Sequence, residues 1–178
     1  MAYSVLIKNS VAAQNVDAWN RSAVSASALE NGFIVKLGAL STTSGEGEVF
    51  VAAVPATGSL TDLWMVYQPE NVATGDKYKN LDPDPRNFIN AIGDIVSVYK
   101  PQLGDIITMT ADGFLGTKGS NGFVNATDTT GGLSLYWGAS KTSSVLSYAL
   151  LATTYISIPD GSIGTQRVTA YKLECVGL

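Results

Sequence analysis

The sequence RVTAYKLECV, residues 167–176, alternates between two kinds of side chain. One set, which includes Tyr171, Leu173 and Cys175, is mostly apolar, whereas the other includes Lys172 and Glu174. Successive side chains of an extended chain point to opposite faces, so an alternation with a period of two predicts a β-strand with one buried face. We therefore expect a strand here, and the same residue types occur in short runs elsewhere.

These runs, rich in β-branched and aromatic residues, recur along the whole chain. Turn signals such as Asn31-Gly32, Asn121-Gly122 and Asp160-Gly161 separate them, because such pairs favour a backbone with positive φ. About ten short strands at this spacing predict an all-β fold, an antiparallel β-barrel or β-sandwich, in a single domain of residues 1–178. Besides residues 167–176, the predicted strands are residues 3–8, 33–37, 49–54, 63–68, 95–100, 105–110, 122–125, 133–137 and 148–158.

Helix is scarce in this sequence. Residues 17–29 have apolar positions compatible with a helix, but their Ser and Asn side chains compete for backbone hydrogen bonds, so we favour a non-helical conformation. Residues 1–30 form an N-terminal arm or a peripheral segment in this interpretation, and extended terminal arms can pair with partners by strand addition. Pro83 and Pro85 exclude a central strand and predict a surface loop over residues 81–86.

The side chains that catalysis most often uses are rare. The chain has no histidine and one cysteine, Cys175, which the strand pattern places on a mostly apolar face as a buried structural thiol. Most carboxylates lie at turns or strand ends, where they bond the backbone. Asp82, Asp84 and Asp94 offer oxygen ligands for calcium, but they lack an EF-hand spacing and the prolines already explain their loop. We therefore expect no enzyme activity, no cofactor, no metal and no small-molecule substrate.

Charge is low as well, at 15% of residues with a formal net charge of −4. The Lys and Arg residues form no cluster, which argues against binding to nucleic acid. The N-terminal residues lack the pattern of a signal peptide, and no apolar run reaches the about 18 residues of a membrane span, so we expect neither secretion nor a membrane. A surface with so few charges is typical of a protein that its neighbours cover.

Two pairs of aromatic residues are predicted to lie on opposite faces of their strands. Trp64 and Tyr67 are three positions apart, and Tyr136 and Trp137 are adjacent, so one member of each pair is expected in the core. The other member is free to act as an interface anchor. Trp19 lies outside any strand pattern and needs cover from the body or from a partner.

Five segments form a pattern of strand and turn residues: YSVLIKN (3–9), LDPDPRNF (81–88), YKPQLGD (99–105), TTYISIP (153–159) and QRVTAY (166–171). Together they resemble small virion proteins of tailed bacteriophages. The resemblance implies a head-decoration or cement protein that binds the major capsid protein on the capsid exterior, is assembled in the bacterial cytoplasm, and is a homo-oligomer, with a trimer as the expected form. The resemblance assigns no catalytic residue to this chain. The interface residues predicted with it are Trp19, Asp82, Asp84, Arg86 and Phe88.

Two other functions remain open at this point. A tail-tube or head–tail connection subunit is a second structural role in a virion, and it would form rings or tubes. A carbohydrate-binding β module belongs to a different class and requires exposed aromatic rings on one face, for example Trp19 with Trp64 or Trp137.

Overall fold

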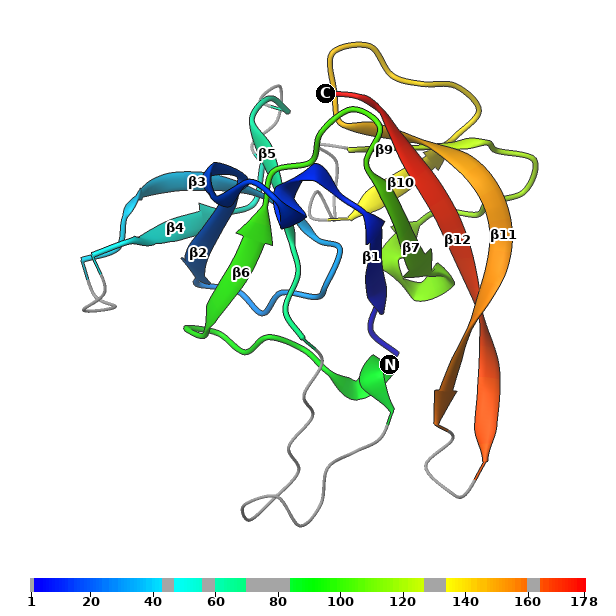
Figure 1. The fold of residues 1–178 in the computed structure, drawn as a ribbon, viewed down its shortest axis with the longest axis horizontal. Coiled ribbons are helices and arrows are strands. Elements are labelled where there is room, and N and C mark those ends of the chain that lie inside the picture. The colour runs from blue at the N-terminus through cyan, green and yellow to red at the C-terminus, as the bar shows by residue number, and fades with distance from the viewer. Residues whose placement is uncertain (1, 43–46, 56–59, 70–83, 127–133, 160–163) are drawn as a thin grey trace.

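The computed structural model describes residues 2–42, 47–55, 60–69, 84–126, 134–159 and 164–178. They form two β-sheets, a closed barrel and a larger open sheet, which lie side by side in Figure 1. Within these ranges, helix is limited to the single 3-10 turns η1 (Ala12–Gln14), η2 (Asp17–Trp19), η3 (Pro85–Asn87) and η4 (Ala111–Gly113). The strands are β1 (Leu6–Ser10), β2 (Asn20–Ser25), β3 (Ile34–Leu40), β4 (Val49–Ala53), β5 (Leu63–Val66), β6 (Ile95–Tyr99), β7 (Ile106–Thr110), β8 (Phe114–Leu115), β9 (Phe123–Ala126), β10 (Leu135–Gly138), β11 (Ser147–Pro159) and β12 (Thr165–Gly177).

The larger sheet has the strand order β1-β7-β12-β11-β9-β10-β8. Its pairs are antiparallel except for the short parallel pair of β8 and β10. The strand that contains residues 167–176, β12, lies inside this sheet, where Leu173 pairs with Ile107 on one side and Leu150 on the other. A strand with partners on both sides explains why Leu173 and Cys175 are buried.

The smaller sheet closes into a barrel in the order β2-β4-β3-β5-β6. β2 and β4 run parallel, and the other pairs are antiparallel. Trp64 is the largest side chain of its interior, and small residues such as Ala23 and Ala52 leave room for it. Closure gives every strand two neighbours, so the barrel has no free edge.

The main core lies between the barrel and the larger sheet. All four residues of β5 are buried. Trp64 and Val66 belong to the barrel interior, whereas Leu63 and Met65 point outward into the main core with Ile107 and Met109 of the sheet. A strand that is buried on both faces is apolar at every position, which is the pattern that β5 shows.

The structure confirms the all-β fold, and each predicted strand overlaps a strand of the fold. Residues 17–29 contain no α-helix, as expected, and fold into η2 and then β2. The structure corrects one detail near the N-terminus. The described residues 2–30 do not form a free arm, because β1 pairs with β7 and β2 pairs with β4 and β6. The strands β2 and β8 were not predicted.

Candidate interaction surfaces

Of the predicted interface residues, two form an ion pair within one turn. Asp84 is the N-cap of η3, and its carboxylate accepts hydrogen bonds from the backbone N–H and the guanidinium of Arg86. The two side chains approach to 2.7 Å, and hydrogen bonding by the guanidinium lowers the pKa of the Asp84 carboxyl. The backbone carbonyl of Arg86 accepts a hydrogen bond from Tyr3. These contacts give Asp84 and Arg86 a role inside the molecule, namely docking the N-terminal segment on η3.

The other predicted residues have different positions. Phe88 follows η3 and is half-buried, and Asp82 lies outside the described residues. Trp19 is half-buried in η2 and packs against the main core, while its backbone carbonyl accepts a hydrogen bond from Lys100. Trp19 therefore receives its cover from the body of the protein. In the part of the chain that the structure describes, no group of three or more metal-ligating side chains comes together.

The aromatic pairs divide between core and surface as the alternation predicts. Trp64 lies inside the barrel and Tyr67 packs on its outside against the main core. Trp137 is buried at 3% exposure, whereas Tyr136 is 49% exposed. Trp64 and Trp137 are thus not available as a sugar-stacking surface, and the arrangement required for the carbohydrate-binding alternative is not present at these residues.

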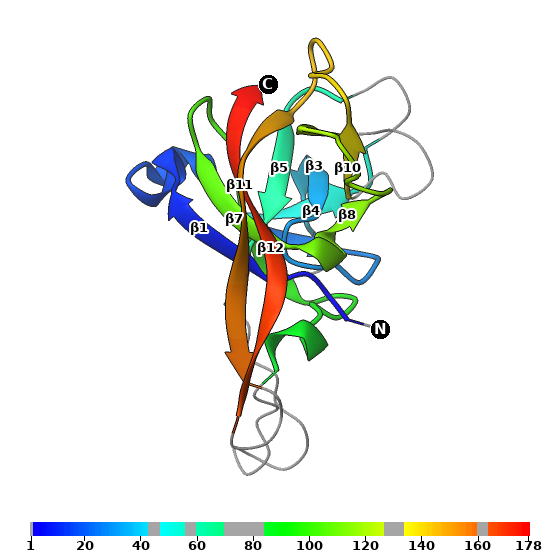
Figure 2. The same ribbon diagram turned by 90° about the vertical axis from the view of Figure 1, so that its right-hand side faces the viewer.

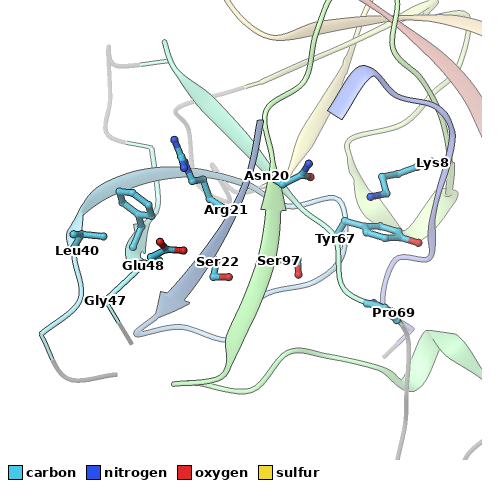
Figure 3. Close-up of a pocket in the computed structure, with 11 residues that line it drawn as sticks. Lys8, Asn20, Arg21, Ser22, Leu40, Gly47, Glu48, Tyr67, Pro69 and Ser97 are labelled. Atoms are coloured by element: carbon cyan, nitrogen blue, oxygen red, sulfur yellow. The ribbon is translucent and has the colours of Figure 1, made fainter. Parts of the chain in front are cut away.

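A groove of about 710 Å³ follows the outer surface of the barrel (Figure 3). Its cations are engaged by aromatic rings: the Nζ atom of Lys8 lies 4.0 Å from the centroid of Tyr67, and the guanidinium of Arg21 lies 5.6 Å from that of Phe50. Burial also lowers the pKa of Lys8. Short polar side chains line the middle of the groove, and Glu48 also lines it, so the groove offers hydrogen-bonding groups to a partner. These middle residues are Asn20, Ser22 and Ser97.

A second surface is apolar, and we call it the barrel patch: Val24, Val51, Ile92 and Ile95. Val24 of β2 pairs with Val51 of β4 on one side and with Ile95 of β6 on the other, so the three side chains form a row. Ile92 lies in the adjoining turn, where the N–H of Gly93 donates a hydrogen bond to the carbonyl of Ser25. Val51, Ile92 and Ile95 are 41%, 69% and 45% exposed. A contiguous apolar patch on a rigid barrel is typical of a protein–protein contact site.

A third surface is the arm, which we define as residues 151–159 of β11 and 165–169 of β12. In the described part of the fold, β9 pairs with β11 only at Ser147–Ala149 and β7 pairs with β12 only from Ala170 onward. Beyond these points the hairpin continues as a two-stranded ribbon that extends away from the rest of the larger sheet (Figures 1 and 2). Leu151 and Tyr155 on it are 48% and 59% exposed. A two-stranded ribbon of this kind gains stability from a further partner.

Comparison of the chain with protein-family models, with curated proteins and with solved structures finds no significant match. Within the described ranges, the structure has no helix long and apolar enough to cross a membrane. Function therefore has to be inferred from the chemistry and placement of the residues themselves.

The single thiol lies away from all three surfaces, in the core. Cys175 is 2% exposed, and burial raises its pKa from 9.0 to about 12. The folded state holds the proton that the unfolded chain releases. The contribution of this group to stability is therefore complete below the ordinary pKa and is lost as the pH rises from 9.0 to about 12. Burial raises the pKa of Tyr99 and Tyr148 in the same direction.

We expect Cys175 to resist thiol reagents in the native protein at pH 8, because thiolate is the reactive form. In denaturant at the same pH the thiol should react completely, and dithionitrobenzoate absorbance measures both rates. In urea titrations, the free energy of unfolding should decline as the pH rises above 9.0. Cys175→Ala should make this decline smaller, and the part that remains should come from Tyr99 and Tyr148. Equal labelling rates in native and unfolded protein would contradict the buried thiol.

Proposed function

We propose that this protein is a structural component of a tailed-bacteriophage virion, a decoration or cement protein that binds the exterior of the capsid through the barrel patch. The observation that carries the proposal is the row of Val51, Val24 and Ile95 across three strands of a closed barrel. The virion assignment itself rests on the sequence resemblance, and the low charge of the chain is consistent with a surface that neighbours cover.

In this proposal the protein acts as a clamp. Fully burying a Val or Ile side chain contributes about 1.5–3 kcal/mol, and the patch residues begin half-exposed, so one copy of the patch supplies modest affinity. An oligomer that presents several patches to a lattice gains avidity, because each later contact forms at a high effective concentration. The closed barrel keeps the patch rigid, so little ordering is needed on binding.

Heads that lack the protein provide the test. We expect purified protein to bind them and to raise their resistance to heat, measured by cosedimentation and by DNA release on warming. Ile95→Lys and Val51→Lys should each weaken binding by about tenfold or more, because a charge then replaces an apolar contact. Both positions are exposed, so the fold should tolerate the changes.

The matched control is Leu103→Lys. Leu103 is 65% exposed but follows the opposite end of β6 from Ile95, so this variant should bind heads like the unmodified protein. If unmodified protein does not bind heads, the decoration role is wrong. If all three variants bind equally, the barrel patch is not the contact.

A tail-tube or head–tail connection subunit is the second candidate. Two features favour it: β1 is the edge strand of the larger sheet among the described strands, and the arm projects from that sheet. Tubes grow by contacts between the sheets of successive subunits. Electron microscopy of the purified protein distinguishes the two roles. Rings or tubes support the tail assignment, and discrete particles support the decoration role.

A further inference from the structure

In the part of the chain that the structure describes, no strand pairs with the outer edge of β11 over residues 151–159, and this edge differs from the other edges of the larger sheet. β1, at one end of the sheet, carries Lys8 and a register shift between Lys8 and Ser10, and β8, at the other end, is only two residues long. Charged residues, bulges and short length are the usual protections against unwanted strand pairing. The sequence of the β11 edge is LATTYISIP, which has no charge and is rich in β-branched and aromatic residues.

An edge strand turns the N–H and C=O groups of alternate residues toward its open side. In the described part of the structure, β9 occupies this side of β11 only at Ser147–Ala149, and a register shift between Leu150 and Ala152 separates that pairing from the arm. Pro159, which has no N–H to donate, ends the strand. A partner strand therefore has a defined place, residues 151–159, whose middle residue is Tyr155.

We propose that the arms of two copies of this chain pair through antiparallel β11 edges about a twofold axis centred on Tyr155. In this register Tyr155 lies opposite the partner's Tyr155, and Thr153 lies opposite the partner's Ser157. Thr154 lies opposite the partner's Ile156, and Ala152 opposite the partner's Ile158. Aromatic pairs and hydroxyl pairs across strands are stabilising, and no like charges meet.

A second copy fits this edge because the edge is complementary to itself. A twofold interface uses the same patch on both subunits, so a charge near the axis would face its own copy, and the edge has none. Tyr155, the most exposed aromatic residue among the large exposed side chains of the described chain at 59%, lies at the centre of the pairing. This inference depends on the arm alone and not on the barrel patch, so it can fail while the proposed function holds.

Cysteine crosslinking tests the axis directly. Tyr155→Cys places two thiols opposite each other, and opposed positions of antiparallel strands have Cα separations that a disulfide accepts. The natural thiol, Cys175, is buried and does not compete. We expect mild oxidation to convert this variant to a covalent dimer on non-reducing gels. The control Tyr136→Cys, at a tyrosine 49% exposed outside the arm, should give at least about tenfold less dimer.

The register has its own test. Thr153→Cys and Ser157→Cys should each crosslink poorly alone, because each thiol lies about 13 Å along the strand from its own copy. Coexpressed, the two variants should form a mixed disulfide in high yield. If Thr153→Cys alone crosslinks as well as the mixture, the register is wrong.

Sedimentation without crosslinks completes the experiment. Unmodified protein should sediment as a dimer, and Tyr155→Lys, which places like charges opposite each other, should sediment as a folded monomer with an unchanged circular dichroism spectrum. A monomeric unmodified protein, a trimer, or equal crosslinking of Tyr155→Cys and Tyr136→Cys would overturn the proposal. A dimer that Tyr155→Lys leaves intact would place the interface elsewhere.

Discussion

Replacing Gly32 by alanine is expected to lower the free energy of unfolding by about 2–4 kcal/mol. The backbone of Gly32 has φ +87°, and a Cβ atom there would lie 2.2 Å from the sulfur of Met109. Met109 is fully buried in the main core, so it has little freedom to move away. The close approach connects the segment before β3 of the barrel with β7 of the larger sheet, and Gly32→Ala should therefore loosen the junction between the two sheets.

Gly104→Ala is the matched control. Its φ of +86° is nearly the same, but nothing lies within 4 Å of the position of its Cβ. This variant should show only the backbone cost of about 1–2 kcal/mol. Urea unfolding of both variants separates the two effects. Equal losses of stability would mean that Met109 accommodates the added methyl group and that the sheets do not require contact at Gly32.

Replacing Trp137 by alanine is expected to cost about 3–5 kcal/mol, the usual range for a buried large aromatic residue. The ring of Trp137 lies 5.2 Å from that of Phe114 and 4.9 Å from that of Tyr171, measured between centroids. These rings come from β10, β8 and β12. The cluster therefore connects the end of the larger sheet at β8 with β12 near the middle of the same sheet. Trp137→Ala removes the shared partner of both rings.

The neighbouring residue provides the control for this prediction. Tyr136 lies on the same strand but faces outward at 49% exposure, so Tyr136→Ala should cost no more than about 1 kcal/mol. Thermal and urea unfolding followed by circular dichroism measure both changes. Comparable losses for the two variants would contradict the assignment of their faces.

The faces of these strands were predictable because they follow from alternation, which is a local property. The same reasoning failed for β2, whose sequence NRSAVS lacks a continuous apolar pattern. Only Ala23 of this strand is buried, and the strand exists because β4 and β6 pair with it on both sides. Tertiary pairing overrides a weak local preference in such a case. The Ser and Asn side chains in residues 17–29 correctly indicated that this segment is not a helix, but they gave no indication of β2.

The interaction surfaces could not be predicted from the sequence for a related reason. Val24, Val51 and Ile95 are far apart in the chain, and only the register of the barrel strands brings them into one row. The arm depends on where β7 and β9 stop pairing, which no local pattern encodes. The prolines of residues 81–86 predicted a surface loop, of which residues 81–83 lie outside the described residues, and the 3-10 turn η3 begins at Pro85. The charged side chains beside it, Asp84 and Arg86, bind each other, and the backbone carbonyl of Arg86 accepts a hydrogen bond from the N–H of Tyr3.

The position of β12 between β7 and β11 has a consequence for biosynthesis. All five barrel strands lie between residues 20 and 99, so the barrel can close while later residues are still being translated. The larger sheet cannot, because β12 is translated after both of its neighbours. Until it emerges, β7 has no partner for its inner edge, and Ile107 and Met109 lack part of their cover. We therefore expect the nascent chain to pass through a stage with a closed barrel and an incomplete sheet, at which chaperones on the ribosome would find exposed apolar surface.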